Sequence, residues 1–378
     1  MSERNLKVLA ICPFPAAFPS TRYRLLQYVG PLKKMGIEVE LRPFLDADEH
    51  RRYFEDPRLL KRLSAITSPL IRRFTDVVKA AGADVVLIQR EAMPFGPGFF
   101  EWMFHTVGRK PLVLDIDDAV YIPYEAGRYG RLGSFLKFYG KTDRLIRSAH
   151  AVVCGGDFLA EYAERKGGRA VVIPTTVDKD VFKPTERAPE IPVIGWIGTP
   201  SSFPYLKAIL PALERLADKH RFKLLLRGSG EDNVAIDGIE IDSGPWSMQT
   251  EVEDFRSIDI GLYPLVENEH QPLEFIQGKS GFKAIQYLAL GIPFVVSPLG
   301  VAASIGVAGR THFEATTVDE WVAKLDILLT DRALRLEMGE LGRQHFLEKF
   351  DLESWAGVLA GVLRSAAASR KTDRSEAV

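Results

Sequence analysis

Residues 277–297 read QGKSGFKAIQYLALGIPFVVS. Ser280 is a favourable helix N-cap, and Gly291 is a favourable residue to end a helix. The apolar run that follows Pro293 is typical of a buried strand. The stretch therefore predicts a loop, a short helix and a strand.

The expected helix has two different faces. Its apolar face holds Phe282, Ile285 and Ala289, whereas Lys283 and Gln286 lie on another face, which we expect to point outward. Lys279 lies just before the cap. A helix N-terminus carries roughly +0.5 charge and unpaired backbone N–H groups, so two lysines beside it predict a diphosphate site. A half-buried helix with solvated lysines is the alternative interpretation.

The stretch resembles the donor-binding helix of the GT-B glycosyltransferases of family 4 (group 1). Their usual pattern is Glu, seven residues, Glu, and then a small residue followed by Gly-Ile/Thr-Pro-Val-Val-Ala-Ser. The two glutamate positions correspond to Gly278 and Gln286 here, so the chain resembles the branch that reads Gly-Lys-x-Gly-Phe-Lys-x-x-Gln-Tyr. The resemblance implies that the donor is bound by Lys279, Ser280, Gly281, Phe282, Lys283 and Gln286.

Length and composition set the broad class of the protein. At 378 residues the chain is longer than one hydrophobic core usually grows, so two domains are expected. A net charge of −1 gives no electrostatic case for nucleic acid as a partner. Only Cys12 and Cys154 occur, which suits a reducing cytoplasm. We expect a cytoplasmic protein, at the inner face of the membrane if it makes a peripheral membrane contact.

Short apolar runs alternate with helical patterns through the first half of the chain, which predicts a parallel, doubly wound sheet. Strands are expected at 6–12, 38–44, 84–89, 111–115, 151–154 and 170–173. A helix is expected from about Ser20 to the stop at Gly36. Residues 51–73 are expected to form a surface helical hairpin whose basic residues face water, with a partner or membrane face as the alternative.

A second alternating series follows a linker-like change of composition at residues 185–192. Strands are expected at 193–197, 222–226, 259–262 and 294–297. The resemblance implies an α/β fold of the GT-B type, with two Rossmann-like, doubly wound parallel-sheet domains that face each other across a cleft. We expect an acceptor-side domain over 1–187 and a nucleotide-sugar donor domain over 188–351. A helix near 352–368 is expected to cross back onto the first domain.

The end of the chain, 369–378, is expected to be a disordered tail. From about Ser365 the end of the chain is rich in Ser, Ala, Lys and Arg, and contact with a membrane surface is the alternative to a solvated end.

Ligands of doubly wound sheets bind outside the carboxyl ends of the strands, so the loops there are candidate sites. Arg22 and Arg24 lie after the first strand at a helix start, where a guanidinium fork suits a phosphate or a carboxylate. The resemblance implies that this loop lies between donor and acceptor. Exposed arginines in a first helical turn are the alternative interpretation.

Three carboxylates, Asp115, Asp117 and Asp118, follow a predicted buried strand. Carboxylates this close together need solvent, cationic partners or a metal ion. No histidine or further carboxylate follows at ligand spacing, and the resemblance implies a metal-independent enzyme, so no metal is expected. Asp117 or Asp118 is expected to orient a hydroxyl group of the donor or the acceptor, with a helix N-cap as the alternative.

Small residues follow two strands of the second half. Gly198 and Thr199 open a turn in which backbone N–H groups can approach a phosphate. Arg227 and Gly228 open a second loop, which the resemblance implies lies near the nucleotide base. Trp246 is an aromatic candidate for holding the ring of that base.

These features predict a retaining glycosyltransferase with Asp117, Asp118 and Arg22 as catalytic candidates. Two lysines and a helix N-terminus can stabilise a departing diphosphate without a metal. The donor is expected to be a UDP- or GDP-sugar with no further cofactor. The acceptor is expected to be a glycan, a lipid-linked compound or a small molecule, in bacterial glycan or polysaccharide synthesis.

Two other functions remain open. The departures at Gly278, Gln286 and Thr199 favour a non-catalytic nucleotide-sugar-binding or scaffold protein. A sugar-nucleotide epimerase of the same fold is the second alternative, for which no paired acid and base groups can be placed.

Overall fold

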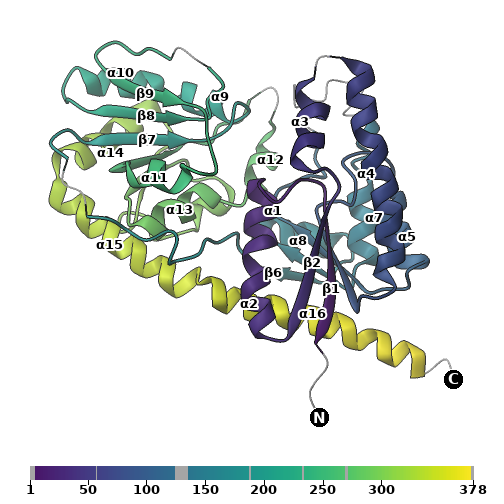
Figure 1. Cartoon of the computed structure of the whole chain (residues 1–378). Coiled ribbons are helices and arrows are strands. Elements are labelled where there is room, and N and C mark those ends of the chain that lie inside the picture. The colour runs from purple at the N-terminus through teal and green to yellow at the C-terminus, as the bar shows by residue number, and fades with distance from the viewer. Residues whose placement is uncertain are drawn as a thin grey trace. The chain divides into compact units, whose positions relative to one another are not determined.

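The structure, a computed structural model, describes residues 5–56, 58–123, 135–186, 189–231, 234–268 and 271–375 (Figure 1). The chain divides into two units. The first comprises Met1–Thr175 and Leu352–Val378, and the second comprises Thr176–Asp351. Each unit is built on a six-stranded sheet in which every pair of neighbouring strands is parallel. The predicted pair of doubly wound parallel sheets is confirmed.

The sheet of the first unit has the strand order β2-β1-β3-β4-β5-β6. Its strands are β1 (Leu6–Cys12), β2 (Ile37–Pro43), β3 (Val85–Gln89), β4 (Leu112–Ile116), β5 (Ala151–Cys154) and β6 (Ala170–Val172). Every residue of β3, β4 and β5 is buried, as in strands that helices cover on both faces.

The helices of the first unit follow the strands in alternation. They are α1 (Pro19–Arg24), the 3-10 helix η1 (Leu26–Tyr28), α2 (Val29–Lys34), α3 (Ala47–Glu55), α4 (Leu59–Ala80), α5 (Phe99–Thr106), α7 (Lys141–Ser148), α8 (Asp157–Arg165) and α16 (Leu352–Ser375). The single helix expected between Ser20 and Gly36 is wrong, because the chain forms three short helices there. Pro31 explains part of the break, since proline fits only in the first turn of a helix and α2 restarts just before it.

The last helix of the chain completes the core of the first unit. Helix α16 packs on α2 and on strands β3 and β4 (Figure 1). Its buried face joins the core that holds Val8, Ala10 and Leu87, and consists of Leu352, Ala356, Leu359, Ala360, Val362, Leu363 and Ala366. Helix α16 runs to Ser375 and so enters the range 369–378 that was expected to be a disordered tail. Residues 376–378 lie outside the described residues.

The second unit has the strand order β12-β11-β10-β7-β8-β9. Its strands are β7 (Val193–Ile197), β8 (Lys223–Arg227), β9 (Glu240–Gly244), β10 (Ile260–Tyr263), β11 (Phe294–Val296) and β12 (Phe313–Glu314). Its helices are α9 (Phe203–Lys207), α10 (Leu210–Ala217), α11 (Glu251–Arg256), α12 (Leu273–Gln277), α13 (Phe282–Leu290), the 3-10 helix η2 (Gly300–Ala303), α14 (Val318–Thr330) and α15 (Arg332–Lys349).

The division between the units lies earlier in the chain than the boundary expected at 187–188. The segment after Thr175 is already bound to the second unit, where the Thr176 hydroxyl donates to the Phe350 carbonyl. Arg343 of α15 then donates to the carbonyls of Lys179 and Phe182. Residues 176–182 therefore belong to the second unit, and the change of composition at 185–192 comes after the point where the units divide.

The expected surface hairpin at 51–73 is partly wrong. Helices α3 and α4 pack against each other, and Arg51 is exposed as expected. Arg73, however, is only 1% exposed. It pairs with Asp76 and donates to the carbonyl of Cys12 at the end of β1. A buried guanidinium needs such partners, and they turn this arginine toward the sheet.

No helix within the described part of the chain has the length and hydropathy needed to cross a lipid bilayer.

Candidate functional site

The sheet of the second unit has its switch point between β7 and β10, because β7 is central and the chain builds outward on both sides of it. Ligands of such sheets bind at the carboxyl ends of the two strands that flank this point. The loop after β7 contains Gly198 and Thr199. The chain after β10 leads through α12 to α13, whose N-terminus lies at the same edge because it returns antiparallel to the strands. The topology thus groups most of the predicted donor-binding residues.

The turn after β7 is lined by hydroxyl groups. The Thr199 N–H donates to Ser202 Oγ at 2.9 Å, and the Thr199 hydroxyl lies 2.9 Å from Ser201 Oγ. Thr199 and Ser201 are exposed. The turn is therefore held in shape by its own side chains and presents hydroxyl groups to solvent.

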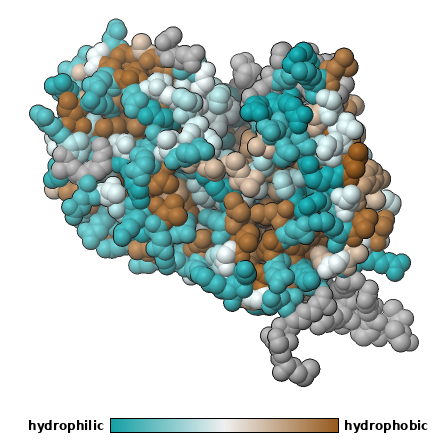
Figure 2. Space-filling model, viewed as in Figure 1, coloured by the Kyte–Doolittle hydropathy of each residue, from teal (hydrophilic) through white to brown (hydrophobic). Residues whose placement is uncertain are grey.

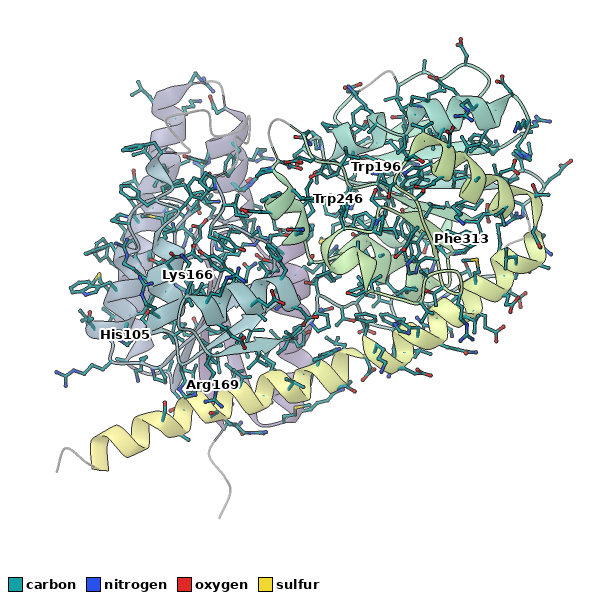
Figure 3. All side chains as sticks on the ribbon, turned by 180° about the vertical axis from the view of Figure 1, so that it is seen from behind. His105, Lys166, Arg169, Trp196, Trp246 and Phe313 are labelled. Carbon is teal, nitrogen blue, oxygen red and sulfur yellow. The ribbon has the colours of Figure 1, made fainter. Side chains whose placement is uncertain are left out.

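Gly228 lies against this turn. Its φ is +78°, and a Cβ atom added there would lie 2.4 Å from the Gly198 carbonyl oxygen and 3.1 Å from Trp246 Cβ. Only glycine adopts this backbone conformation readily, and only glycine leaves room for the neighbouring loop. Trp246, labelled in Figure 3, follows β9 at the same edge. The structure thus brings together Gly198, Gly228 and Trp246.

Arg227 has a structural role that the sequence did not suggest. Its guanidinium forms a two-pronged pair with Asp242, with Nη1–Oδ1 and Nη2–Oδ2 distances of 3.0 and 2.9 Å. Its Nε donates to Asp254 Oδ1 at 2.9 Å. The hydrogen bond from Arg227 holds the pKa of Asp242 below its usual value. This guanidinium joins β8, β9 and α11 and is occupied by carboxylates, so it is not aimed at a ligand.

Helix α13 begins one residue later than the predicted cap. Gly281, with φ +64°, is the N-cap, and Ser280 forms no side-chain cap. A Cβ atom at Gly281 would lie 2.5 Å from Ile305 Cδ1, so the start of the helix packs closely on the chain after η2. Gly291, with φ +65°, ends the helix as predicted. No side chain caps the helix at Gly281, whose own carbonyl accepts from the N–H groups of Ala284 and Ile285.

The two predicted lysines flank this helix start. Lys279 Nζ lies 4.8 Å from the centre of the Phe275 ring and 5.6 Å from that of Tyr205. Lys283 Nζ donates to Gln286 Oε1 at 3.2 Å and lies 5.2 Å from the Phe255 ring. Both lysines are half-buried. Aromatic faces attract ammonium groups, so the rings hold both charges near the N-terminus of α13.

Gln286 does not point outward as expected. It is fully buried, and its Nε2 donates to Glu251 Oε1 at 3.1 Å. Two consecutive hydrogen bonds therefore connect Lys283 through Gln286 to the buried side chain of Glu251 on α11. Sequence analysis missed Glu251, whose only signal was its place in the acidic first turn of a helix.

The first unit has its own switch point, between β1 and β3. Next to it, Asp117 and Asp118 follow β4 and share one cation. Arg90 Nε donates to Asp117 Oδ1 at 2.5 Å, and Arg90 Nη2 donates to Asp117 Oδ2 at 2.8 Å and Asp118 Oδ2 at 2.5 Å. Burial alone would raise the pKa of Asp117, but the Arg90 guanidinium outweighs it and leaves that pKa below its usual value. Asp117 is therefore a carboxylate, 4% exposed.

Asp115 and Arg24 form a second, deeper pair. Arg24 Nη2 donates to Asp115 Oδ2 at 2.7 Å, and both residues are buried. Burial raises the pKa of Asp115, against the opposing effect of Arg24. The expectation that Arg24 joins Arg22 in binding an anion is therefore wrong. Within the described ranges, no three His, Cys, Asp or Glu side chains gather to hold a metal ion.

Arg22 is half-buried in the last turn of α1. Its Nη2 donates to the Tyr23 hydroxyl at 2.7 Å, and its guanidinium carbon lies 4.3 Å from the centre of that ring. The Thr21 hydroxyl donates to the Phe14 carbonyl at 3.1 Å, which fixes the loop before the helix. Arg22 is therefore held against the ring of Tyr23, and its role in binding an anion stays a prediction.

No family model matches the sequence, and no curated protein matches it. Solved structures match over nearly the whole chain. Sucrose-phosphate synthase from Thermosynechococcus elongatus superimposes with a TM-score of 0.69 at 12% identity, covering 97% of this chain and 100% of that one. A glycosyltransferase from Rickettsia africae gives 0.67 at 13% identity, covering 96% and 98%.

A third similar structure is Anabaena HepE in complex with UDP-glucose. It superimposes with a TM-score of 0.65 at 14% identity, covering 96% of this chain and 100% of that one. This chain has the GT-B fold. At such low sequence identity the likeness establishes the architecture, so the activity has to be argued from the residues of the site.

Proposed function

We propose that this chain is a metal-independent, retaining glycosyltransferase of the GT-B class, similar to family 4. It transfers a sugar from a nucleoside diphosphate donor to a hydroxyl group of a glycan, a lipid-linked compound or a small molecule. The observation that carries the proposal is the pair of half-buried lysines, Lys279 and Lys283, at an uncapped helix start on the carboxyl edge of the second unit.

The chemistry of this helix start suits a diphosphate leaving group. The reaction leaves negative charge on the departing diphosphate, and catalysis requires groups already oriented to stabilise that charge. Lys279 and Lys283 supply two cations, and the N-terminus of α13 supplies the positive end of a helix dipole. A metal ion is not needed for this step.

Other parts of the second unit complete a nucleotide site. The hydroxyl groups of Thr199 and Ser201 can accept and donate hydrogen bonds to phosphate oxygens or a sugar. Trp246, beside Gly228, offers an aromatic face to a base ring. HepE was solved with UDP and with UDP-glucose, which supports a uridine donor for this chain, with GDP as the alternative.

In the first unit, Asp117 is held ionised by Arg90 and can accept a hydrogen bond from a sugar hydroxyl. Asp118 is the more exposed of the two carboxylates. Arg22, on the helix that follows β1, is the candidate for binding an anionic group. The pairing with Arg90 favours a positioning role for the carboxylates over metal binding.

Calorimetric titration tests the proposal. UDP, GDP and UDP-glucose are added to the full chain in the presence of EDTA, and to the Lys279→Ala/Lys283→Ala variant. At least one nucleotide should bind the native chain with EDTA present, and the double variant should lose that binding. Absence of binding, or equal affinity in the variant, would contradict the donor site. Binding without transfer to any acceptor would indicate the non-catalytic alternative.

A further inference from the structure

Two neighbouring helices of the first unit present large apolar side chains to solvent. On α4, Ile71, Phe74 and Val78 are 63%, 47% and 75% exposed. On α5 and just after it, the exposed fractions are 44% for Phe99, 56% for Trp102 and 61% for Val107. We refer to these six residues as the α4–α5 face. Figure 2 shows hydrophobic side chains along the edge of the molecule where Figure 1 places the two helices.

The aromatic residues of this face form a continuous layer. The ring centres of Phe74 and Phe99 lie 6.2 Å apart, and those of Phe99 and Trp102 lie 6.1 Å apart in a stacked arrangement. The buried Phe100 supports them from below, with its ring 5.0 Å from that of Phe74. Because three rings contact one another across two helices, the face is one surface and not a scatter of single residues.

The core of the first unit does not need this face. Helix α4 already buries Ala65, Val77 and Ala80 on its inner side. Its outer side repeats the apolar pattern at residues 71, 74 and 78, a spacing that keeps them on one stripe. Soluble monomers rarely expose contiguous apolar patches larger than a few hundred square ångströms unless something binds there.

The exposed charges on the helices of the face and just after them are cationic. Between Leu59 and Lys110, all four acidic residues are buried or half-buried, namely Asp76, Asp84, Glu91 and Glu101. Arg109, two residues after Val107, is exposed, as is Arg144 on α7. Lys79 is also exposed on α4, where it pairs with Glu40. Because Glu40 offsets Lys79, the cationic charge of the rim comes from Arg109 and Arg144.

An apolar pocket opens beside the face. Its volume is about 430 Å³, and Phe99, Trp102 and Leu145 contribute to its wall together with Pro97. Arg144 lies on the pocket lining and donates through Nη2 to the Pro97 carbonyl at 2.8 Å. His105, labelled in Figure 3 at the outer edge of the first unit, also lines the pocket. An apolar pocket with an arginine on its lining suits a hydrocarbon chain that ends in an anionic group.

We propose that the α4–α5 face docks on the surface of an anionic phospholipid bilayer. Exposed Phe and Trp rings lie at the level of the headgroups, and the cationic rim is attracted to anionic lipid. A second copy of the chain fits less well, because two-fold association through the same face would bring its cationic rims together. The membrane contact considered from sequence for the tail, 369–378, or the hairpin, 51–73, is assigned here to residues 71–107. This proposal does not depend on sugar transfer.

Flotation of the full chain with vesicles tests the proposal. Vesicles of phosphatidylcholine alone are compared with vesicles that also contain phosphatidylglycerol, with no nucleotide or acceptor present. The native chain should float with the anionic vesicles and bind the neutral ones weakly. Arg109→Gln/Arg144→Gln should lower the partition onto anionic vesicles by about fivefold for each charge removed. Phe99→Ser/Trp102→Ser should lower it by at least as much on both kinds of vesicle.

Matched variants separate this face from exposed residues in general. Leu336→Ser/Leu347→Ser removes two exposed leucines from α15, and Arg310→Gln/Arg332→Gln removes two exposed arginines from the second unit. Both controls should float like the native chain. Val78→Ser removes an apolar side chain of the face at a position that is 75% exposed, so this variant should fold like the native chain. If all face variants floated like the native chain, the proposal would be overturned. It would also be overturned if the native chain bound no lipid but self-associated, and the same substitutions abolished that self-association.

Discussion

The Arg90 guanidinium binds Asp117 through two hydrogen bonds, Nε to Oδ1 at 2.5 Å and Nη2 to Oδ2 at 2.8 Å. Arg90 follows β3 with φ +59°, and Asp117 follows the adjacent strand β4. The pair therefore joins two strand ends that lie side by side in the sheet. It also decides the charge state of a carboxyl group that burial alone would tend to neutralise.

Replacing Arg90 should make stability depend on pH in the opposite sense. In the native chain the pKa of Asp117 is lowered, so its contribution is present at neutral pH and is lost as pH falls below about 4. In Arg90→Gln the buried carboxylate has lost its cation, which should cost about 3 to 5 kcal/mol near pH 7. Its pKa then rises above the unfolded value, so the deficit should shrink as pH falls.

Urea unfolding at neutral and acidic pH measures this difference. Arg90→Gln/Asp117→Asn serves as the control, because it removes the charge together with its partner and should recover part of the deficit near neutral pH. A deficit of equal size at both pH values would contradict the assignment.

Single substitutions of Lys279 and Lys283 should weaken nucleotide binding while leaving stability nearly unchanged. A charge-assisted contact contributes about 1.5 to 3 kcal/mol, so each Lys→Ala change should raise Kd by roughly tenfold to a hundredfold. Melting without ligand should hardly change. The loss of a cation–π contact, about 0.5 to 1 kcal/mol, is opposed by relief of repulsion from the helix dipole.

Lys207→Ala is a matched control for that experiment. Lys207 Nζ lies 4.9 Å from the Phe203 ring centre and pairs with Glu231, so it also loses an aromatic contact. Its Kd for nucleotide should stay at the native value. A similar loss of affinity in all three variants would indicate a general charge effect on the unit.

The substitution Gln286→Glu should destabilise the second unit at neutral pH. It would place a second carboxylate against the buried Glu251, and two carboxylates in one site cannot both be ionised without a large cost. One carboxyl group should then titrate with a raised pKa. Its contribution to folding is complete below the unfolded pKa and is lost as pH rises, so the melting temperature should recover in acid.

Gln286→Glu with Glu251→Gln restores one carboxylate and one amide and should melt like the native chain at pH 7.

Two glycine substitutions should have opposite effects on stability. Gly228→Ala should lower the free energy of unfolding by about 1 to 3 kcal/mol, because φ is +78° and the new Cβ would lie 2.4 Å from the Gly198 carbonyl. It should also weaken nucleotide binding. Gly357→Ala lies within α16 with nothing near its Cβ, and should raise that free energy by about 0.5 to 1 kcal/mol. Chemical denaturation measures both, and equal effects would contradict the close approach of the two loops.

The strands were predictable where both sheet faces are covered. Continuous apolar runs placed β1, β5 and β7 at their observed bounds. Strand β9, Glu240–Gly244, was missed because it is polar and largely exposed. An edge strand of this kind carries no periodic apolar signal, and only its pairing with β8 defines it.

The sequence placed the glycines in a loop and the lysines at a helix start, but it did not reveal the ion pairs around the candidate site. Sequence patterns identified Gly228 and Lys283, since turn geometry and helix ends depend on local residues. Arg90 and Glu251 were missed, because their partners are 27 and 35 residues away and are brought close only by the sheet and by helix packing. The apolar and polar faces of α13 were predicted from helical spacing. Which face points outward could not be predicted, because Gln286 is buried against Glu251 of α11.

Helix α16 makes the first unit discontinuous in the chain, with residues 176–351 between its two parts. A ribosome therefore releases every residue of the second unit before the first unit can bury Val8, Ala10 and Leu87 under Ala356 and Ala360. Strands made earliest must wait for a helix made last, and during that time their apolar surface is open to chaperones and to neighbouring chains. A stop codon near position 351 would thus leave the second unit complete, whereas the first unit would lack the helix that covers its core.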